Sequence, residues 1–419
     1  MNTQFDVVIV GGGLAGACAA ALLVRHAGLP PERVALLDEF PPTLTLGDLP
    51  ELRVVAVSRA SERILRSAGA WQLLDETRLC PYERMRVWHE TVPPLGSGSL
   101  CFDAADVGEP NLGFIAENNA LAAACQRSFE GGGGTRIASA LTRLTMTSDG
   151  ATLDTAQGDA ITARLVIGAD GAQSLVRSQL ALPIRTFDYR QRAIVASVRT
   201  AIPHAHTAWQ RFLDTGPLAL LPLFNGFTSI VWSVDTAPAS ELLAADDGQF
   251  NQRLTTAADE VLGAMTVVGR RVSFPLQSLA AHAYVSPHCA LIGDAAHVIH
   301  PLAGQGANLG LLDAAALVDA VADAVEQGED PGALRILRRY EQQRRPHNLA
   351  TDAAMSALRR GFARAPGPGA WLVNRALATV QRSAWLKQAF ARQALGLTGE
   401  LPLLARSTGA AGDRPSPRR

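Results

Sequence analysis

The chain has 419 residues, which suggests two or three domains at the usual size of roughly 100 to 200 residues each. Its hydrophobic fraction of 47% and charged fraction of 18% indicate a globular protein with a large core and exclude a disordered chain. Lys and Arg number 38 against 39 Asp and Glu, so no overall basic field favours nucleic acid as a partner. The five cysteines lack C-x-x-C spacing, which favours a reducing compartment over a disulfide framework or a zinc site.

A βαβ unit is predicted at the start of the chain. Residues 5–10 form an apolar β-branched run, residues 14–26 an Ala-rich helix and residues 34–37 a second strand. Further buried strands are predicted over 163–167 and 288–292, and both end in small or acidic residues. Because ligands gather at the carboxyl ends of the strands in open α/β sheets, we expect the site at that edge.

The remaining elements are predicted from periodicity and composition. Residues 192–234 contain short alternating runs that predict a separate antiparallel sheet, which we expect to form the wall of a substrate site. Helical spacing is found over 58–74, and Ala/Leu/Arg-rich helices are predicted over 314–345 and 350–392. The tail over 407–419, rich in Gly, Pro, Ser and Arg, is predicted to be disordered.

A Gly-rich turn follows the first strand. Gly11, Gly13 and Gly16 form a G-x-G-x-x-G pattern between a strand and a helix, the context in which it indicates dinucleotide binding. The glycines permit a tight turn and close backbone approach, so amides near Leu14 and Ala15 and the helix dipole could stabilise a pyrophosphate.

Asp38 ends the second strand, about 20 residues beyond the turn, where a carboxylate would accept bonds from ribose hydroxyls. This fingerprint does not separate NAD from FAD. The sequence contains no G-x-S-x-G elbow and no P-loop, which argues against the common hydrolases and NTPases. The histidine pairs at 204/206 and 297/300 have no carboxylate or cysteine set at ligand spacing, so no metal site is predicted.

Two downstream segments decide between NAD and FAD. Residues 168–177 (GADGAQSLVR) and 293–310 (GDAAHVIHPLAGQGANLG) resemble the two further signatures of the para-hydroxybenzoate hydroxylase-like flavin monooxygenases. The resemblance implies bound FAD, with Asp294 accepting from ribitol hydroxyls and the 304–306 turn offering amides to reduced flavin. Asp170 and Arg177 match the segment associated with both FAD and the nicotinamide donor.

Within that superfamily the pattern is similar to the ubiquinone-biosynthesis hydroxylases over nearly the whole chain. The segments that carry this likeness are 52–58 (LRVVAVS), 116–121 (AENNAL) and 274–278 (FPLQS). The resemblance implies that Arg53 and Asn118 touch the flavin. Two positions depart from the usual pattern: Asp38 stands where Glu is commoner, and Ala307 where a bulkier apolar residue is usual.

The expected fold class is α/β, a Rossmann-like FAD-binding domain with an inserted antiparallel substrate domain and a C-terminal helical region. The resemblance places the FAD-binding domain at 1–75, 112–182 and 275–345, the substrate domain at 76–111 and 183–274, and the helical region at 346–406. No catalytic side chain is located by the sequence. The predicted cofactor-binding residues are Gly11, Gly13, Leu14, Ala15, Gly16, Asp38, Arg53, Asn118, Asp170, Gly171, Asp294, Pro301, Gly304, Gln305, Gly306, Ala307 and Asn308.

The resemblance implies an aromatic hydroxylase. NAD(P)H, a transient co-substrate with no second Gly-rich fingerprint of its own, would reduce FAD. O2 would then form a flavin C4a-hydroperoxide that delivers oxygen to a phenolic ring. The implied substrate is a polyprenylated intermediate of ubiquinone biosynthesis. The alternatives are a monooxygenase of a soluble aromatic acid or secondary metabolite, a flavin reductase or oxidase of prenyl chains, and a non-enzymatic FAD-binding scaffold.

The expected partners are O2, a lipophilic aromatic substrate and other ubiquinone-biosynthesis proteins. We expect a cytoplasmic location, with peripheral contact on the inner face of the membrane. Residues 371–392 interleave aromatic and basic side chains and form an amphipathic surface suited to membrane or partner contact. The alternative for this segment is an ordinary helix packed on the FAD domain.

Overall fold

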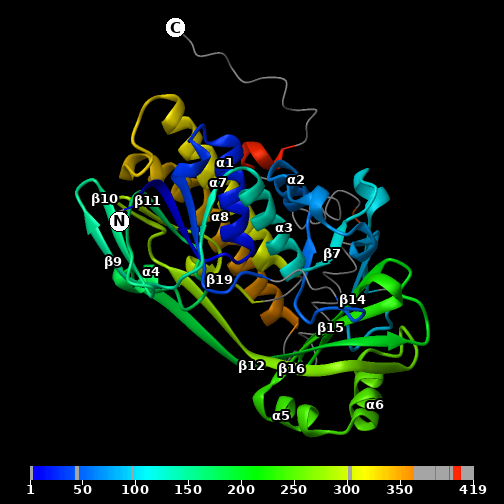
Figure 1. Ribbon diagram of the computed structural model, residues 1–419. Coiled ribbons are helices and arrows are strands. Elements are labelled where there is room, and N and C mark those ends of the chain that lie inside the picture. The colour runs from blue at the N-terminus through cyan, green and yellow to red at the C-terminus, as the bar shows by residue number, and fades with distance from the viewer. Residues whose placement is uncertain are drawn as a thin grey trace.

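The computed structural model describes residues 3–42, 47–96, 98–300, 304–362, 383, 396 and 400–406, without the side chains of 358–362. Two large sheets and one small sheet organise this part of the chain (Figure 1). The mixed α/β architecture confirms the predicted fold class. The division into domains stays a prediction.

The first sheet contains the N-terminal βαβ unit. Its parallel part has the strand order β8-β2-β1-β11-β18, and β17, β10 and β9 extend it by antiparallel pairing. The predicted strands and the first helix are confirmed. The bounds are β1 Thr3–Val10, α1 Leu14–His26, β2 Val34–Leu37, β8 Thr135–Ile137, β9 Leu141–Thr147, β10 Gly150–Thr155, β11 Ala160–Gly168, β17 Val285–Ser286 and β18 Cys289–Leu291.

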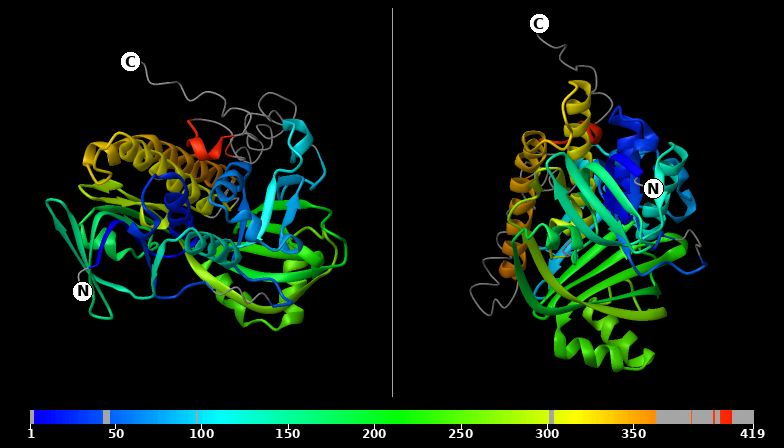
Figure 2. Two further views of the ribbon diagram at one scale, coloured as in Figure 1. Left: turned by 45° about the horizontal axis from the view of Figure 1, so that its top comes forward. Right: turned by 60° about the vertical axis from the view of Figure 1, so that its left-hand side comes forward.

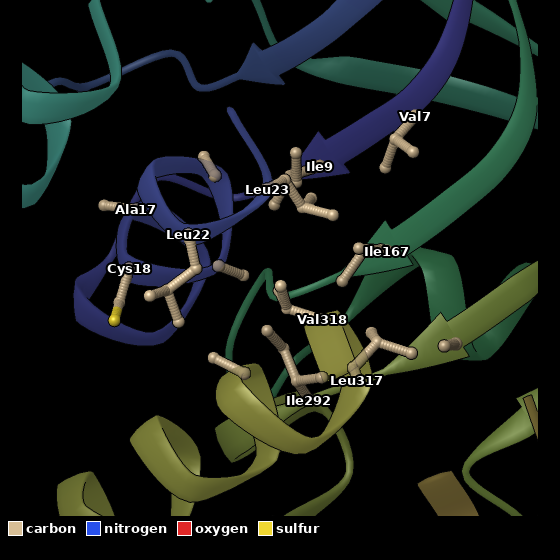
Figure 3. Close-up of a cluster of buried hydrophobic side chains, with 14 of the residues drawn as sticks. Val7, Ile9, Ala17, Cys18, Leu22, Leu23, Ile167, Ile292, Leu317 and Val318 are labelled. Atoms are coloured by element: carbon tan, nitrogen blue, oxygen red, sulfur yellow. The ribbon is translucent and has the colours of Figure 1, made fainter. Parts of the chain in front are cut away.

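Helix α1 packs between the sheet and two further helices, α3 (Asn118–Gly131) and α7 (Gln305–Glu326). Figure 3 shows the resulting core, in which Leu23 of α1 lies beside Ile9 of β1. The small side chains of α1 let the helix approach the strands closely, and nine of its 13 residues are buried. This packing holds the first turn of α1 at the carboxyl edge of the sheet.

The second sheet has the order β19-β16-β12-β15-β14-β13-β5-β6. Its neighbouring strands pair antiparallel except β13 with β5, which confirms the antiparallel sheet predicted over 192–234. Helices α5 (Thr236–Ala244) and α6 (Asp247–Ala257) cover its outer face, away from α1 (Figure 2). The strands are β5 Arg84–His89, β6 Leu100–Asp103, β12 Ile184–Thr200, β13 Thr207–Leu213, β14 Gly216–Pro222, β15 Phe227–Asp235, β16 Met265–Ala281 and β19 His297–Val298.

A third, small sheet packs against the second large sheet. Strand β7 (Gly113–Glu117) pairs antiparallel with β3 (Val54–Val57) and β4 (Cys80–Tyr82). Helix α2 (Arg59–Ser67) follows β3 and covers only the first part of the helical stretch predicted over 58–74. A turn at Ala68 ends it before a short 3-10 helix.

The prediction of one continuous helix over 314–345 is wrong. Helix α7 ends at Glu326 and α8 (Leu334–Phe362) begins eight residues later, so the break lies earlier than the sequence pattern indicated. Gly328 adopts a left-handed φ of 66° at this turn, which glycine does without steric cost. By contrast, Pro346 lies inside α8. The second helix predicted over 350–392 is described only to residue 362.

Candidate functional site

A cavity of about 2020 Å³ lies between the carboxyl edge of the first sheet and the inner face of the second. One side is formed by the carboxyl ends of β1, β2 and β11 and by the segment after β18. The other side is formed by the inner face of the second sheet and by α8. This is the edge at which ligands bind in open α/β sheets. Its volume is about twice the upper end of the roughly 300 to 1,000 Å³ usual for one small-molecule pocket.

The Gly-rich turn borders the cavity directly. A Cβ at Gly16 would lie 2.0 Å from the carbonyl oxygen of Gly11, so only glycine permits the tight turn. A Cβ at Gly13, by contrast, would have no described neighbour within 4 Å. Helix α1 begins without a side-chain cap, so the amides of its first turn, next to Leu14 and Ala15, remain available to a ligand in the cavity.

Asp38 lines the cavity beside this turn. Its carboxylate is held close to Gly12 by Gln126, whose amide donates to the carbonyl oxygen of Gly12 at 2.9 Å and to Asp38 at 3.5 Å. Burial raises the pKa of Asp38, against the hydrogen bonds from Gly12 and Gln126 that favour its ionised form. The position suits an acceptor for sugar hydroxyls, as the sequence predicted.

Asp170 and Gly171 lie on the same edge, after β11. One carboxylate oxygen of Asp170 caps helix α4 (Leu175–Gln179) by accepting from the amides of Leu175 and Val176 at 2.7 and 3.1 Å. The other, Oδ1, is buried and has no hydrogen-bond partner among the described residues. Asp170 lines the cavity and can therefore serve both the fold and a ligand.

Arg177 does not line the cavity. Its guanidinium donates to the carbonyl oxygens of Ala172 and Ala295, at 2.7 and 2.8 Å, and so ties the Asp170 segment to the Asp294 segment. Burial lowers the pKa of Arg177, partly offset by the charge of Asp170. In the described part of the chain, Arg177 therefore joins the loop after β11 to the loop after β18 from outside the cavity.

Asp294 lines the cavity from a short 3-10 helix, η6 (Gly293–Ala295). A buried network that the sequence analysis missed lies behind it. Asp313 of α7 accepts from the amide of Gly293 at 3.2 Å, and its side chain is also hydrogen-bonded to His297 and to Arg344 of α8. The Asp313 side chain is fully buried.

Burial opposes ionisation of Asp313, but His297 and Arg344 hold its pKa well below the usual range. Asn348 adds a further hydrogen bond of 3.1 Å. The charged cluster thus joins η6, α7 and α8 and fixes where Asp294 meets the cavity. Only the apolar spacing of α7, which places Asp313 on a buried face, could have pointed to it in the sequence.

The start of α7 forms the next part of the wall. Gly304 has a left-handed φ of 64° and begins the helix without a side-chain cap. Gln305, Gly306 and Ala307 follow and line the cavity. Backbone amides at this helix start could stabilise negative charge on a ligand. Pro301 lies outside the described residues.

Asn308 ties α7 to β3. The side-chain oxygen of Asn308 accepts a hydrogen bond from the backbone amide of Ser58 at 3.0 Å. Its side-chain nitrogen donates to the backbone carbonyl oxygen of Ala56 at 2.9 Å. Through these bonds it positions the neighbouring Arg53, which lies just before β3. The amide of Asn118 donates to the carbonyl oxygen of Arg53 at 2.9 Å, so these two distant residues meet at the cavity.

The residues present fit FAD. All the predicted positions in the described chain except Gly16 line one continuous cavity, and Gly16 is needed for the turn itself. Two uncapped helix starts, at Gly13 and Gly304, suit a diphosphate and an electron-rich ring, and Asp38 and Asp294 suit two sets of sugar hydroxyls. When bound there, FAD supplies the redox chemistry, accepting electrons from NAD(P)H and activating O2.

The opposite wall is apolar. Along β12, β14 and β15 alternate residues face either the cavity or the outer helices, as a pleated sheet requires. Ile194, Leu220 and Trp232 pack against α5 and α6. The apolar residues of these strands that line the cavity are Val195, Ala219, Leu221 and Val231.

The geometry and the comparisons agree on the class of protein. Residues 4–354 match the family model described as FAD binding domain. The fold is also that of p-nitrophenol 4-monooxygenase PnpA from Pseudomonas putida DLL-E4, with a TM-score of 0.75 at 18% identity over 94% of this chain and 99% of that one. The chain is an FAD-dependent monooxygenase whose electron donor is NAD(P)H.

Two curated relatives narrow the family. The 3-demethoxyubiquinol 3-hydroxylase of Escherichia coli (strain K12) is 33% identical over 400 residues, which cover 94% of this chain and 100% of the relative. Ubiquinone hydroxylase UbiL of Rhodospirillum rubrum is 36% identical over 393 residues, covering 93% and 89%. The chain belongs to the ubiquinone-hydroxylase (UbiH/COQ6-like) family of FAD-dependent hydroxylases, which confirms the resemblance drawn from its motifs.

Membrane-spanning helices and clustered metal ligands are both absent from the described residues. None of the helices in this part of the chain is long and apolar enough to cross a membrane. Among the same residues, no three His, Cys, Asp or Glu side chains are grouped so that they could hold a metal ion.

Proposed function

We propose that this protein hydroxylates the aromatic ring of a polyprenylated phenol or benzoquinol in ubiquinone biosynthesis, using O2 and NAD(P)H. One observation carries the proposal: a single cavity joins the FAD-type segments to an apolar sheet face, with room for more than one small ligand. The names of the two curated relatives support a ubiquinone precursor as the substrate.

In this proposal the chain's own residues bind and orient both ligands. The first-turn amides of α1 hold the diphosphate, Asp38 and Asp294 accept from the two sugar portions, and the start of α7 faces the isoalloxazine ring. Arg53 and Asn118 contact the flavin from the small sheet. No side chain is assigned as a general acid or base.

The apolar wall has a second task, which is to exclude water from the reacting oxygen. Leu221 and Val231 of the second sheet and Met355 of α8 line the cavity opposite the Gly-rich segments. Such a wall binds a ring and the first units of a prenyl chain while it displaces water from them. A small soluble acid would leave much of this apolar surface wet.

The decisive experiment is the quinone profile of a strain that lacks the gene. We expect ubiquinone to fall and one under-hydroxylated prenylated precursor to accumulate, which would name both the ring and the position. Normal ubiquinone content without a precursor would overturn the proposal.

Turnover of the purified holoenzyme separates the alternatives. With ¹⁸O2, prenylated phenols should yield labelled product and consume NAD(P)H faster than small phenolic acids do. Faster turnover of small acids would favour a soluble-substrate monooxygenase. Prenyl-chain reduction or oxidation without label would indicate a reductase or oxidase, and no substrate-stimulated NAD(P)H consumption would indicate a scaffold.

A lipophilic substrate also supports the proposal that the protein is cytoplasmic and contacts the inner face of the membrane or other ubiquinone-biosynthesis proteins. The amphipathic segment at 371–392 lies outside the described residues, except Ser383. Recovery of the protein with membranes should decrease when this segment is deleted. Unchanged recovery would remove the segment from the proposal.

A further inference from the structure

One buried amide interrupts the apolar wall of the cavity. On β13, Ala208, Gln210 and Phe212 face the cavity and Trp209 also borders it, while Arg211 faces outward and donates to carbonyl oxygens at the end of α6. Among the described cavity-lining residues of the second sheet, Gln210 is the only buried carboxamide. The other glutamine, Gln277, is exposed.

The surroundings of Gln210 offer it no partner. Its relative exposure is 6%, and its side chain makes no hydrogen bond with any other described residue. The residues paired with it are Ala219 on β14 and Val87 on β5, neither of which has a polar side-chain atom. A carboxamide has two donors and an acceptor, and the carboxamide of Gln210 borders the open space of the cavity, where a ligand can reach it.

Gln210 also lies well inside the cavity rather than at its edge. Leu221, two residues beyond Ala219 on β14, packs in the cluster that includes Ala56 of β3. Ala56 in turn is the nearest neighbour of Gly304 at the start of α7, at 3.3 Å from a Cβ there. On the other side, Met355 of α8 packs with Val87 and Phe212. The amide is thus enclosed between the flavin-type segments and α8.

We propose that Gln210 hydrogen-bonds an oxygen substituent on the substrate's aromatic ring and so determines which ring edge is presented for hydroxylation. The inference rests on the proposed function only in requiring an aromatic ring with a hydroxyl group. The apolar neighbours provide area for binding but no direction, because burial of apolar surface is non-directional. A single amide in such a wall provides orientation, since its hydrogen bonds have preferred geometry.

The test measures binding to the FAD-loaded protein without turnover. Dissociation constants of paired ring analogues, each pair differing by one hydroxyl group, are obtained from the change in flavin absorbance. The wild-type protein should bind the hydroxylated member about tenfold more tightly, which corresponds to about 1.4 kcal/mol. Gln210→Leu, which matches the apolar wall, should lose that preference and keep its affinity for the member without the hydroxyl.

A second readout is the position of hydroxylation. Product analysis by mass spectrometry and NMR should show one isomer for the wild-type protein and a mixture for Gln210→Leu. The matched control is Gln252→Leu, the same change on the exposed face of α6, outside the cavity. If Gln210→Leu fails to fold, Gln210→Met provides the same test with an unbranched side chain.

The outcomes separate this inference from the proposed function. An unchanged hydroxyl preference in Gln210→Leu or Gln210→Met, with a wild-type protein that binds prenylated phenols, overturns the role of Gln210 alone. If the wild-type holoenzyme binds neither prenylated nor plain phenols, the proposed function and this inference fall together. Loss of the preference together with mixed products supports the assignment.

Discussion

The two sides of the cavity use different chemistry. The flavin side combines backbone features, namely the glycines Gly11, Gly13 and Gly16 and uncapped helix starts, with carboxylate side chains at strand ends. The substrate side is built from alternate side chains of an antiparallel sheet. A diphosphate needs close backbone approach, which few residues permit, whereas an apolar ring needs only area and shape. The first side is therefore restricted in sequence and the second is not.

The largest expected effect comes from behind the flavin side. Asp313→Asn should lower the free energy of unfolding by about 3–5 kcal/mol, because Arg344 loses the charge that compensates its guanidinium in a buried site. Chemical denaturation measures this. Asp323→Asn, on an exposed position of the same helix, should have little effect. Equal stabilities of the two variants would show that the cluster contributes nothing beyond packing.

The next effect is confined to FAD binding. Gly13→Val introduces a side chain into space that is open in the protein and that the diphosphate would occupy. The dissociation constant for FAD should rise at least about a hundredfold, or 2.7 kcal/mol, with little change in the melting temperature of the FAD-free protein. Gly131→Val, which also faces open space but lies away from the cavity, should retain flavin. Equal flavin content in both variants would exclude Gly13 from the site.

A smaller effect should appear on the substrate side alone. Val231→Thr keeps the side-chain shape but adds a hydroxyl to the apolar wall, so KM for a prenylated phenol should rise about tenfold. Bound FAD per chain should stay unchanged. Val325→Thr on α7 is the control, since Val325 does not line the cavity. A loss of flavin in Val231→Thr would mean that the two sides are not separable.

The smallest effect is a pH dependence. Burial lowers the pKa values of His347, in the cavity wall, and of His204, near β14. Each is neutral in the folded protein at a pH where the unfolded chain is protonated, so its contribution to stability is complete above about pH 6.5 and is lost as pH falls below it. His347→Gln should flatten the decline in unfolding free energy between pH 7 and 5. The exposed His282→Gln should not.

The sequence predicted elements whose pattern is local. The βαβ unit, with α1 at Leu14–His26 and β2 at Val34–Leu37, follows from apolar periodicity and from glycines that tolerate a tight turn. It was less successful at the end of α7, where Gly328 ends the helix and Pro346 does not end the next one. Whether a breaker acts depends on packing around it, which periodicity does not record.

The sequence by itself determined the cofactor class and the family of this protein, because the glycine and Asp motifs reflect close backbone contacts that only particular residues allow. The tertiary structure decided which distant residues meet. It placed Arg53 against Asn118, linked Asp294 to the charges around Asp313, and turned Gln210 toward the cavity beside apolar neighbours. Such contacts depend on strand pairing and helix packing between segments that are twenty or more residues apart, which no local pattern specifies.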